Sequence, residues 1–266
     1  MPKVYNSEKS TWEDSTSDIG RWCGTPTMNA PVKNMLQNED VVLNSTVCAM
    51  AKTATGEWSL CLEESGWSKD KFDAVVCAVP APQALVLVEP HSSTLAGVAS
   101  STTMKGAWAL MLQYPTPLDL PFDSAFINGG PLSWIARDSS KPGRDSGVDT
   151  WLVHATAAWS HDNIEKSSEE VATTLLDALC SLKVPPGTKQ INLPHTWTAH
   201  RWRYATTHPN LNIHSVWDKE AKLGMCGDWL DEGKVEGAWL SGRHLADSIN
   251  ESLCSSGSGA PTASKL

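Results

Sequence analysis

The sequence predicts a mixed fold of the α/β (α+β) class, and three observations support this. A continuous apolar run over residues 74–79 is typical of a strand that is buried on both faces. Residues 107–113 and 150–156 have the composition of further strands. Residues 167–182 carry apolar side chains at three- and four-residue steps, which predicts an amphipathic helix.

The first sixty residues predict short elements. Residues 1–25 are polar and weakly patterned, with Trp12 and Trp22 as their main anchors. A short helix is expected near residues 28–36 and should begin at Pro31, because proline is tolerated in the first helical turn. Further on, Val47, Ala49 and Ala51 alternate, as do Trp58, Leu60 and Leu62, with residues 53–56 between the two sets. This predicts a hairpin or a pair of adjacent strands.

The middle elements have clear boundaries. Pro80 should close the strand over residues 74–79, since proline cannot donate to a sheet ladder. In the strand 150–156, Trp151, Val153 and Ala155 should share one face and His154 should lie on the other. Ser167 and Glu170 form a capping-box pattern at the start of the following helix, which ends at a Pro-Pro-Gly sequence.

A strand, a turn and a helix near the C-terminus form the most informative stretch. An apolar run over residues 223–226 ends at Gly227 and Asp228, and a helix begins near Val235. The predicted apolar stripe of this helix comprises Val235, Ala238, Trp239, Gly242, Leu245, Ala246, Ile249 and Leu253. The small residues Gly237 and Ala238 leave the first turn open to a ligand. First-turn N–H groups attract anions, and Asp228 can accept a hydrogen bond from a hydroxyl group. The stretch therefore predicts a site for a polyhydroxylated, anionic ligand.

Composition limits the partners. The net charge of −9 argues against nucleic acid and against an anionic membrane surface. No run approaches the about 18 apolar residues of a membrane span, and the N-terminus has no hydrophobic signal region. Seven cysteines without a C-x-x-C pattern indicate free thiols in a reducing compartment. Thirteen tryptophans can be core residues, and some of them can line a pocket for a flat ring.

The chain ends in Ser264-Lys265-Leu266, the tripeptide that addresses proteins to the peroxisome. It follows a segment rich in serine and glycine, which should leave it accessible. We therefore expect the peroxisomal import receptor as a partner and a peroxisomal location, with a cytoplasmic location as the alternative.

Residues 200–204 are the best candidates on the substrate side. Strand alternation should place His200, Trp202 and Tyr204 on one face, where the aromatic rings can stack on a flat ligand. Arg201 and Arg203 should then lie on the opposite face and could meet phosphates. An ordinary sheet strand with surface ion pairs explains the segment about equally well.

Other polar residues have plainer explanations. Arg137, Lys141 and Arg144 surround a Pro-Gly turn, and a solvated loop is favoured there over a phosphate clamp. His154 is expected to be a hydrogen-bonded sheet residue, and Glu236 can serve as a first-turn charge that favours the helix dipole. No metal site is expected.

Several segments, in this order, resemble the renalase-like branch of the FAD-dependent amine oxidase superfamily. They are residues 76–83 (VCAVPAPQ), 134–144 (WIARDSSKPGR), 151–160 (WLVHATAAWS), 199–205 (AHRWRYA), 227–228 (GD) and 235–242 (VEGAWLSG). The resemblance covers the chain except for about its last dozen residues. Several motifs in one order are more specific than a single glycine pattern.

The resemblance implies a fold with an incomplete FAD-binding Rossmann-like domain and a mainly antiparallel β-sheet substrate domain. In this division, residues 26–92 and 214–254 belong to the FAD-binding domain, and residues 1–25 and 93–213 to the substrate domain. Residues 255–266 form a flexible tail. The implied cofactor-binding residues are Val47, Pro80, Gly227, Asp228, Val235, Glu236, Gly237, Ala238 and Trp239. His200, Trp202 and Tyr204 are the implied catalytic candidates.

The resemblance also implies an activity and raises an alternative. The substrates would be dihydronicotinamide dinucleotide isomers or an amine, oxidised by hydride transfer to flavin, with O₂ as the acceptor. Relatives begin with a Gly-x-Gly-x-x-Gly turn that holds the FAD pyrophosphate, and no such pattern occurs in these 266 residues. We therefore expect an N-terminally truncated relative with weak or absent FAD binding. The alternative is an inactive remnant or a binding protein without a functional cofactor site.

Overall fold

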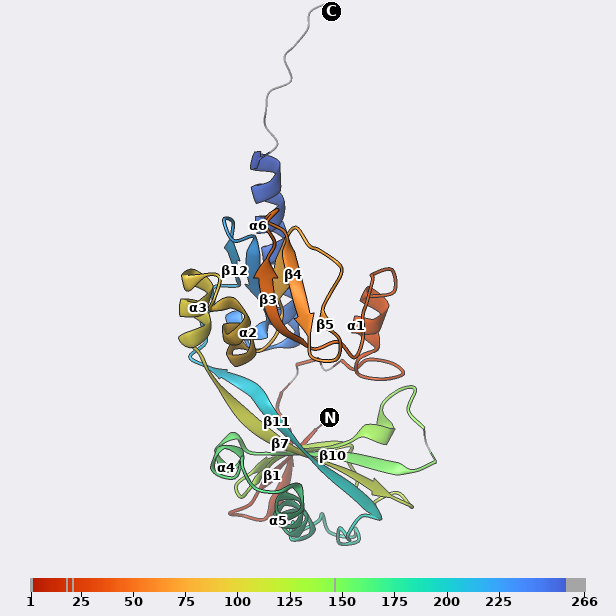
Figure 1. The fold of residues 1–266 in the computed structure, drawn as a ribbon. Coiled ribbons are helices and arrows are strands. Elements are labelled where there is room, and N and C mark those ends of the chain that lie inside the picture. Colours follow the sequence, from red (N-terminus) through yellow and green to blue (C-terminus); the bar gives the residue numbers. More distant parts are fainter. Residues whose placement is uncertain (1, 18, 21, 146, 257–266) are drawn as a thin grey trace, which may run out of the picture. The chain divides into compact units, whose positions relative to one another are not determined.

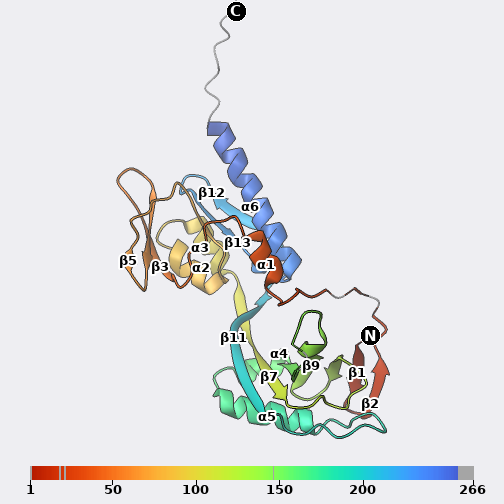
Figure 2. The ribbon, with the colours of Figure 1, turned by 90° about the vertical axis from the view of Figure 1, so that its right-hand side faces the viewer.

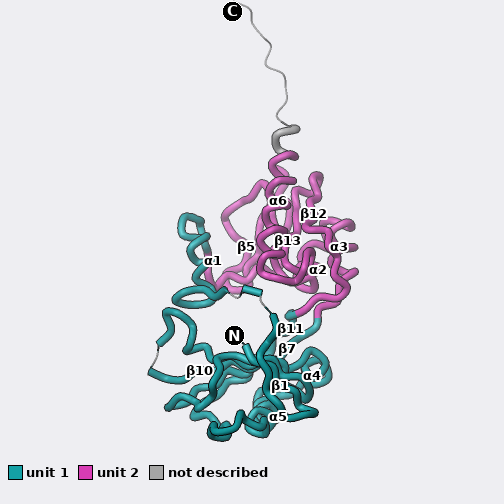
Figure 3. Tube along the Cα trace, turned by 180° about the vertical axis from the view of Figure 1, so that it is seen from behind, with its two compact units in different colours: residues 1–41, 105–205 teal, residues 42–104, 206–266 magenta. Residues whose placement is uncertain are grey.

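The computed structural model describes residues 2–17, 19–20, 22–145 and 147–256, and only the backbone of 253–256. The chain forms two compact units, each built from two stretches of sequence (Figure 3). Unit 1 comprises residues 1–41 and 105–205, and unit 2 comprises residues 42–104 and 206–266. The assignment of substrate and cofactor roles to parts of the chain remains a prediction.

Unit 1 is built mainly on one sheet (Figure 1). Its elements are β1 (Lys3–Asn6), β2 (Thr11–Asp14), α1 (Ala30–Met35), β7 (Thr103–Tyr114), β8 (Ser124–Asn128), β9 (Leu132–Arg137), η1 (Asp138–Ser140), β10 (Asp149–Ala155), α4 (Ala157–Asp162), α5 (Ser168–Cys180) and β11 (Thr196–His208). Strands β7 and β11 cross the boundary between the units.

The seven strands of unit 1 follow the order β11-β7-β10-β9-β8-β1-β2. Strand β10 is antiparallel to β7 and β9, β8 is antiparallel to β9, and β1 is parallel to β8 and antiparallel to β2. One face carries the core, where α5 packs its apolar stripe, with Val171, Leu175 and Leu179 buried. The predicted capping box of α5 is present at Ser167 and Glu170.

The opposite face of this sheet is open, and residues that pair across strands share it. Leu152 pairs with Met111 on one side and with Ala136 on the other, and His154 pairs with Trp134. The predicted alternation in this strand is confirmed, because Trp151, Val153 and Ala155 are buried on the core face. Phe126 stacks on Trp134, with ring centroids 4.5 Å apart.

Unit 2 combines two small sheets with three helices (Figure 2). Its elements are β3 (Val47–Lys52), β4 (Trp58–Leu62), β5 (Gly66–Trp67), β6 (Val75–Cys77), α2 (Ala81–Val88), α3 (Ser93–Ser100), β12 (Ser215–Asp218), β13 (Leu223–Cys226), η2 (Asp228–Leu230) and α6 (Val235–Ser256). The sheet orders are β3-β4-β5 and β12-β13-β6. The predicted β3–β4 hairpin and the helix that begins at Val235 are confirmed.

The second sheet positions the predicted cofactor residues. Strand β13 pairs in parallel with β6 and antiparallel with β12, and α6 packs along β12 and β13 (Figure 2). Burial on both faces of β6 was predicted, but Val76 is 42% exposed. The reason is that β6 lies at the edge of its sheet within the described part of the chain. Pro80 closes this strand as predicted, yet Pro80 also caps α2, which the sequence reading had not recognised.

Among the described residues, none of the helices is both long enough and apolar enough to span a membrane. Taken together, the mixed α/β elements and the largely antiparallel sheet of unit 1 agree with the predicted fold class.

Candidate functional site

The carboxyl ends of two neighbouring parallel strands meet at one edge of unit 2. Strands β6 and β13 are in register, with Leu223 opposite Val75 and Met225 opposite Cys77. The chain leaves β6 toward Pro80 and leaves β13 at Gly227. In α/β sheets, ligands bind outside the carboxyl ends of such strands. The structure thus brings two of the predicted cofactor segments to the same edge.

Trp229 links these two segments. Its side chain is 1% exposed, and its indole Nε1–H donates to the carbonyl oxygen of Val79 at 3.1 Å. Gly227 lies directly under this ring with φ +153, and a Cβ there would be 2.9 Å from the indole. A side chain at position 227 would therefore displace Trp229, which explains why a glycine is required after β13.

Asp228 presents a carboxylate that the fold leaves available. Its carbonyl oxygen accepts from the N–H groups of Asp231 and Gly233, which closes the turn η2. Its partly exposed carboxylate makes no hydrogen bond or ion pair within the described residues. By contrast, the carboxylate of Asp218 bonds Ser92, and that of Asp231 bonds His214. A free acceptor at this position can receive a ligand hydroxyl group.

The first turn of α6 is accessible, but not in the way that the sequence predicted. Val235 is 89% exposed and Trp239 is 47% exposed, and Glu236 and Ala238 are exposed too. Gly237 is instead buried, and a Cβ there would lie 3.1 Å from the amide nitrogen of Glu232. Its small size admits the preceding loop of this chain, so the prediction that Gly237 opens the turn to a ligand is corrected.

The packed face of α6 also differs from the predicted stripe. Leu245 is 2% exposed as expected, whereas Val235, Ala238, Trp239 and Ala246 face solvent. Among residues 235–252 of α6, those that are buried are Gly237, Ser241 and Leu245. They are spaced by four residues, so they form a single face, but two of them are not apolar.

Ser241 is a functional candidate that the sequence reading missed. This fully buried hydroxyl accepts from the backbone N–H of Gly227 at 2.9 Å and donates to the carbonyl oxygen of His214. The ring of His214 in turn contacts the buried carboxylate of Asp231, with Nδ1 and Oδ2 3.0 Å apart. These contacts hold the turn after β13 against α6. The sequence offered one signal for the burial of Ser241: it follows Gly237 by four residues and so lies on the same face of the helix.

A cavity of about 470 Å³ in unit 2 brings two further predicted segments together. Its lining includes Val47 and Cys48 of β3, Val79 beside Pro80, and Gln83 and Leu87 of α2. Val47 and the end of β6 thus face one space, which is large enough for a flat heterocycle. The adenine contact that the resemblance implies for Val47 remains a prediction.

The predicted substrate-side residues belong to β11 in unit 1. The rings of His200 and Trp202 lie 4.3 Å apart, and Trp202 and Tyr204 are 57% and 39% exposed. Arg201 and Arg203 both pair with Glu165, at 3.1 and 3.0 Å. The predicted separation of aromatic residues from arginines is therefore present. The arginines are already engaged in ion pairs, so the aromatic face is the one available to a ligand.

The open face of the same sheet is hollowed near β10. A cavity of about 450 Å³ is lined by Met111, Leu152, Thr198 and the indole of Trp197, among others. On this face, burial and then the ammonium of Lys141 lower the pKa of His154. A lowered pKa favours the neutral imidazole at pH 7, and the role of His154 as a hydrogen-bonded sheet residue remains a prediction.

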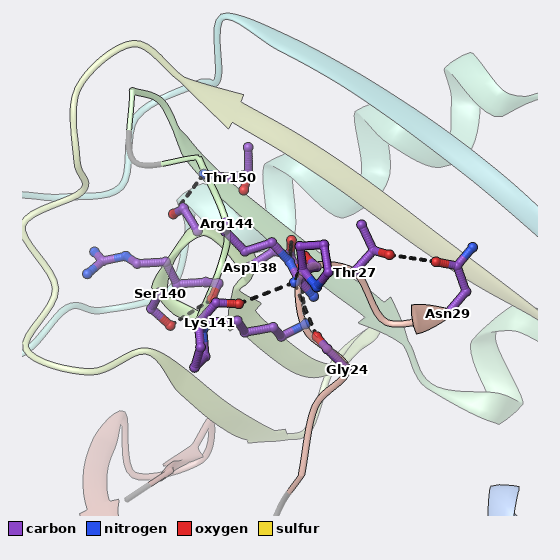
Figure 4. Close-up of polar contacts among 12 residues, drawn as sticks. Gly24, Thr27, Asn29, Asp138, Ser140, Lys141, Arg144 and Thr150 are labelled. Atoms are coloured by element: carbon purple, nitrogen blue, oxygen red, sulfur yellow. Dashed lines mark hydrogen bonds and ion pairs between the residues drawn. The ribbon is translucent and has the colours of Figure 1, made fainter. Parts of the chain in front are cut away.

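The basic loop of unit 1 is engaged by its own fold (Figure 4). Lys141 and Arg144 both contact the carboxylate of Asp138, at 2.6 and 3.2 Å. Arg144 also donates to the carbonyl oxygens of Gly24 and Pro26. Burial alone would raise the pKa of Asp138, but these two cations outweigh it and lower that pKa. The loop thus fastens a distant segment and is neither freely solvated nor free to clamp phosphate.

The two candidate groups lie in different units. All nine predicted cofactor residues belong to unit 2, and the three predicted catalytic residues belong to unit 1. No cluster of three or more His, Cys, Asp or Glu side chains that could hold a metal occurs among the described residues.

Comparison with known proteins identifies the family. The sequence pattern of the flavin-containing amine oxidoreductases matches residues 7–250. Solved structures with a similar fold include a candidate protoporphyrinogen oxidase from Exiguobacterium sp. 255-15, with 11% identity and a TM-score of 0.63. They also include putrescine oxidase bound to putrescine (16%, 0.59) and cyclohexylamine oxidase from Brevibacterium oxydans IH-35A (15%, 0.59).

The matched regions cover 84%, 83% and 84% of this chain, but only 51%, 52% and 51% of those three structures. The chain thus spans about half the length of the structures it resembles. At these identities the likeness concerns the fold. The match over residues 7–250, however, covers most of the 266 residues. The chain therefore belongs to the flavin-containing amine oxidoreductases, a family of FAD-dependent enzymes.

Proposed function

We propose that this chain supplies flavin-contacting and substrate-contacting surfaces of an FAD-dependent oxidoreductase of the renalase-like branch. One observation carries the proposal. The carboxyl ends of β6 and β13 are joined by Trp229, and the unengaged carboxylate of Asp228 belongs to η2, which contacts α6. This arrangement suits a ligand with hydroxyl groups and negative charge.

The residues of unit 2 fit one side of FAD. Asp228 would accept from a hydroxyl group of the cofactor's polyol chain, since no group of the described chain occupies its carboxylate. The exposed first turn of α6, with Val235, Glu236 and Ala238, would face the negative or electron-poor part. Val47 and Pro80 would contact the ligand from β3 and from the end of β6. When bound, flavin supplies the chemistry by accepting a hydride from the substrate.

The exposed aromatic face of β11 supports the substrate part of the proposal. His200, Trp202 and Tyr204 would hold a flat ring by stacking and would shield it from water. We propose a dihydronicotinamide dinucleotide isomer or an amine as substrate and O₂ as electron acceptor. Glu165 pairs with both arginines of this strand and offsets one of their two charges, so we propose that ring stacking contributes more to recognition than phosphate contacts.

A second candidate function is a binding protein or remnant without a functional cofactor site. The observation in its favour is that Gly237 in the first turn of α6 is buried, and a Cβ there would lie 3.1 Å from the amide nitrogen of Glu232. The preceding loop of the chain therefore occupies part of the space next to this turn.

Flavin titration separates the two functions. We expect the 266-residue chain to purify without stoichiometric flavin, and we expect a fusion to a family-type βαβ segment with a Gly-x-Gly-x-x-Gly turn to bind FAD. In that fusion, Asp228→Ala should weaken FAD binding roughly ten- to a hundredfold, because a hydrogen bond to a charged group is worth roughly 1.5–3 kcal/mol.

Asp247→Ala is the matched control, since this aspartate is an exposed residue of α6. Fluorescence quenching of FAD reports the affinity, and circular dichroism reports folding. If the fusion binds no FAD although it is folded, the binding-protein alternative holds. If Asp228→Ala and Asp247→Ala bind FAD equally well, the proposed role of Asp228 is wrong.

A further inference from the structure

Two cysteines of unit 2 lie next to each other across the β3–β4 hairpin. Val47 pairs with Leu62 and Ala49 pairs with Cys61, so Cys48 is the extra residue of a β-bulge. A bulge redirects a side chain relative to the regular alternation of a strand. Here the thiol of Cys48 is brought to Cys61 and donates to its carbonyl oxygen, with Sγ and O 3.3 Å apart.

The two thiols also interact with each other. Partial burial raises the pKa of the Cys61 thiol, and the hydrogen bond and charge of the Cys48 thiol raise this pKa further. In a β-bulge two residues of one strand oppose one residue of its partner, so Cys48 lies next to the Ala49–Cys61 pair. The 3.3 Å contact of the Cys48 sulfur with the carbonyl oxygen of Cys61 places the two residues close enough for a bond between their side chains to be tested.

The pair is more accessible than the other two described cysteines of unit 2. Cys48 is exposed and Cys61 is half-buried, whereas Cys77 and Cys226 of the same unit are buried. Burial raises the pKa of Cys77 to about 11 and also raises the pKa of Cys226. A thiol must be accessible and deprotonated to react, so the buried thiols should be inert. Cys23 in unit 1 is a free, exposed cysteine.

We propose that Cys48 and Cys61 form a peroxide-sensitive pair that converts reversibly into an intramolecular disulfide. The Cys48 thiolate attacks one oxygen of hydrogen peroxide, the O–O bond breaks, and Cys48 becomes a sulfenic acid as one water is released. The Cys61 sulfur then attacks the Cys48 sulfur, the S–O bond breaks, and a second water leaves. In total, two thiols and one peroxide yield one disulfide and two waters.

The Cys48–Cys61 disulfide would change the wall of a cavity in unit 2. Cys48 lines the 470 Å³ cavity together with Val47 and Val79. A disulfide would hold its side chain against β4 and fix the bulge beside Val47. The thiol chemistry itself does not depend on flavin binding, so the proposed function could fail while this inference stands.

Mass spectrometry of the folded 266-residue chain tests the pair. The reduced protein is treated with hydrogen peroxide, blocked with N-ethylmaleimide and digested without reductant. We expect a cross-linked peptide that contains Cys48 and Cys61 and that disappears after treatment with dithiothreitol. Loss of the free Cys48 thiol should be at least about tenfold faster than loss of the buried Cys77 thiol.

Single variants identify the order of events. In Cys61→Ser, Cys48 should stop at the sulfenic acid and be trapped by dimedone; in Cys48→Ser, Cys61 should remain open to alkylation. Exposed Cys23 is the internal control, because its oxidation shows that the peroxide dose is sufficient. Oxidised Cys23 without a Cys48–Cys61 cross-link overturns the proposal. So does loss of the Cys61 thiol at the parent's rate in Cys48→Ser.

Discussion

The indole N–H of Trp229 donates to the carbonyl oxygen of Val79, and this bond of 3.1 Å connects the ends of two parallel strands. Trp229 follows β13, and Val79 follows β6. Because Trp229 is 1% exposed, water cannot replace its hydrogen bond without rearrangement of the core. This bond holds together the two segments between which we place one side of the cofactor.

Trp229→Phe should test this bond, although it also removes part of a buried ring. The variant keeps an aromatic ring but leaves the carbonyl oxygen of Val79 without its donor, which should lower the free energy of unfolding by about 1–3 kcal/mol. Trp67→Phe is the control, because Trp67 is 54% exposed, and it should change stability by no more than about 0.5 kcal/mol. Urea unfolding followed by circular dichroism measures both. Equal stability of the two variants would contradict a structural role for the bond.

Two glycines of α6 should respond differently to alanine. A Cβ at Gly242 would meet no atom within 4 Å, so Gly242→Ala should stabilise the protein by about 0.5–1 kcal/mol through helix propensity. At Gly237 the same Cβ would lie 3.1 Å from the amide nitrogen of Glu232. Gly237→Ala should therefore gain less than Gly242→Ala, and Gly237→Val should destabilise the fold. Thermal unfolding measures the order of stability of the three variants. The opposite order would mean that the loop at Glu232 moves away from a new side chain at little energetic cost.

The sequence predicted elements well where the signal was local. The capping box at Ser167, the helix start at Val235 and the alternation around His154 all depend on neighbouring residues, and the structure confirms them. Exposure of Val76 was not predictable in the same way. An apolar run indicates a strand, but its position at a sheet edge depends on distant partners.

The polar residues of the candidate site were also hard to predict where their contacts involve distant parts of the sequence. Gly227 and Asp228 were recognisable because a glycine and an acid end a short strand. Ser241 was not recognised, and its burial depends on two backbone groups, those of Gly227 and His214. Its four-residue spacing from Gly237 indicates a shared helix face, but this spacing does not reveal long-range hydrogen-bond partners. The same reason explains why Gly237 was read as a ligand contact when it accommodates the loop at Glu232.

The C-terminal tripeptide Ser264-Lys265-Leu266 lies outside the described residues, and its role remains a prediction from the sequence. A fluorescent protein fused in front of this chain should give a punctate peroxisomal pattern in a eukaryotic cell. Deletion of Leu266 should make the signal diffuse, because the receptor reads the terminal tripeptide. Diffuse signal from both fusions, with a peroxisomal marker intact, would favour the cytoplasmic alternative.

The pH dependence of unit 2 should include a contribution from Asp218. Its carboxylate accepts from the amide of Ala221 at 2.9 Å and from the hydroxyl of Ser92 at 2.6 Å, and these bonds lower its pKa. Ser92 is the N-cap of α3, so the contact ties this helix to the turn after β12. A lowered folded-state pKa means that the unfolded chain binds the proton more readily. The stability contributed by Asp218 is therefore complete above about pH 4 and is lost as the pH falls through the lowered pKa.

Asp218→Asn should be less stable than the parent at pH 7, and the difference should shrink below about pH 4. Asp247→Asn, at an exposed position of α6, should follow the parent at every pH. Urea unfolding between pH 3 and pH 7, at about the same ionic strength throughout, measures the three curves. A difference between parent and Asp218→Asn that stays constant over this range would show that the Asp218 contacts do not depend on its charge.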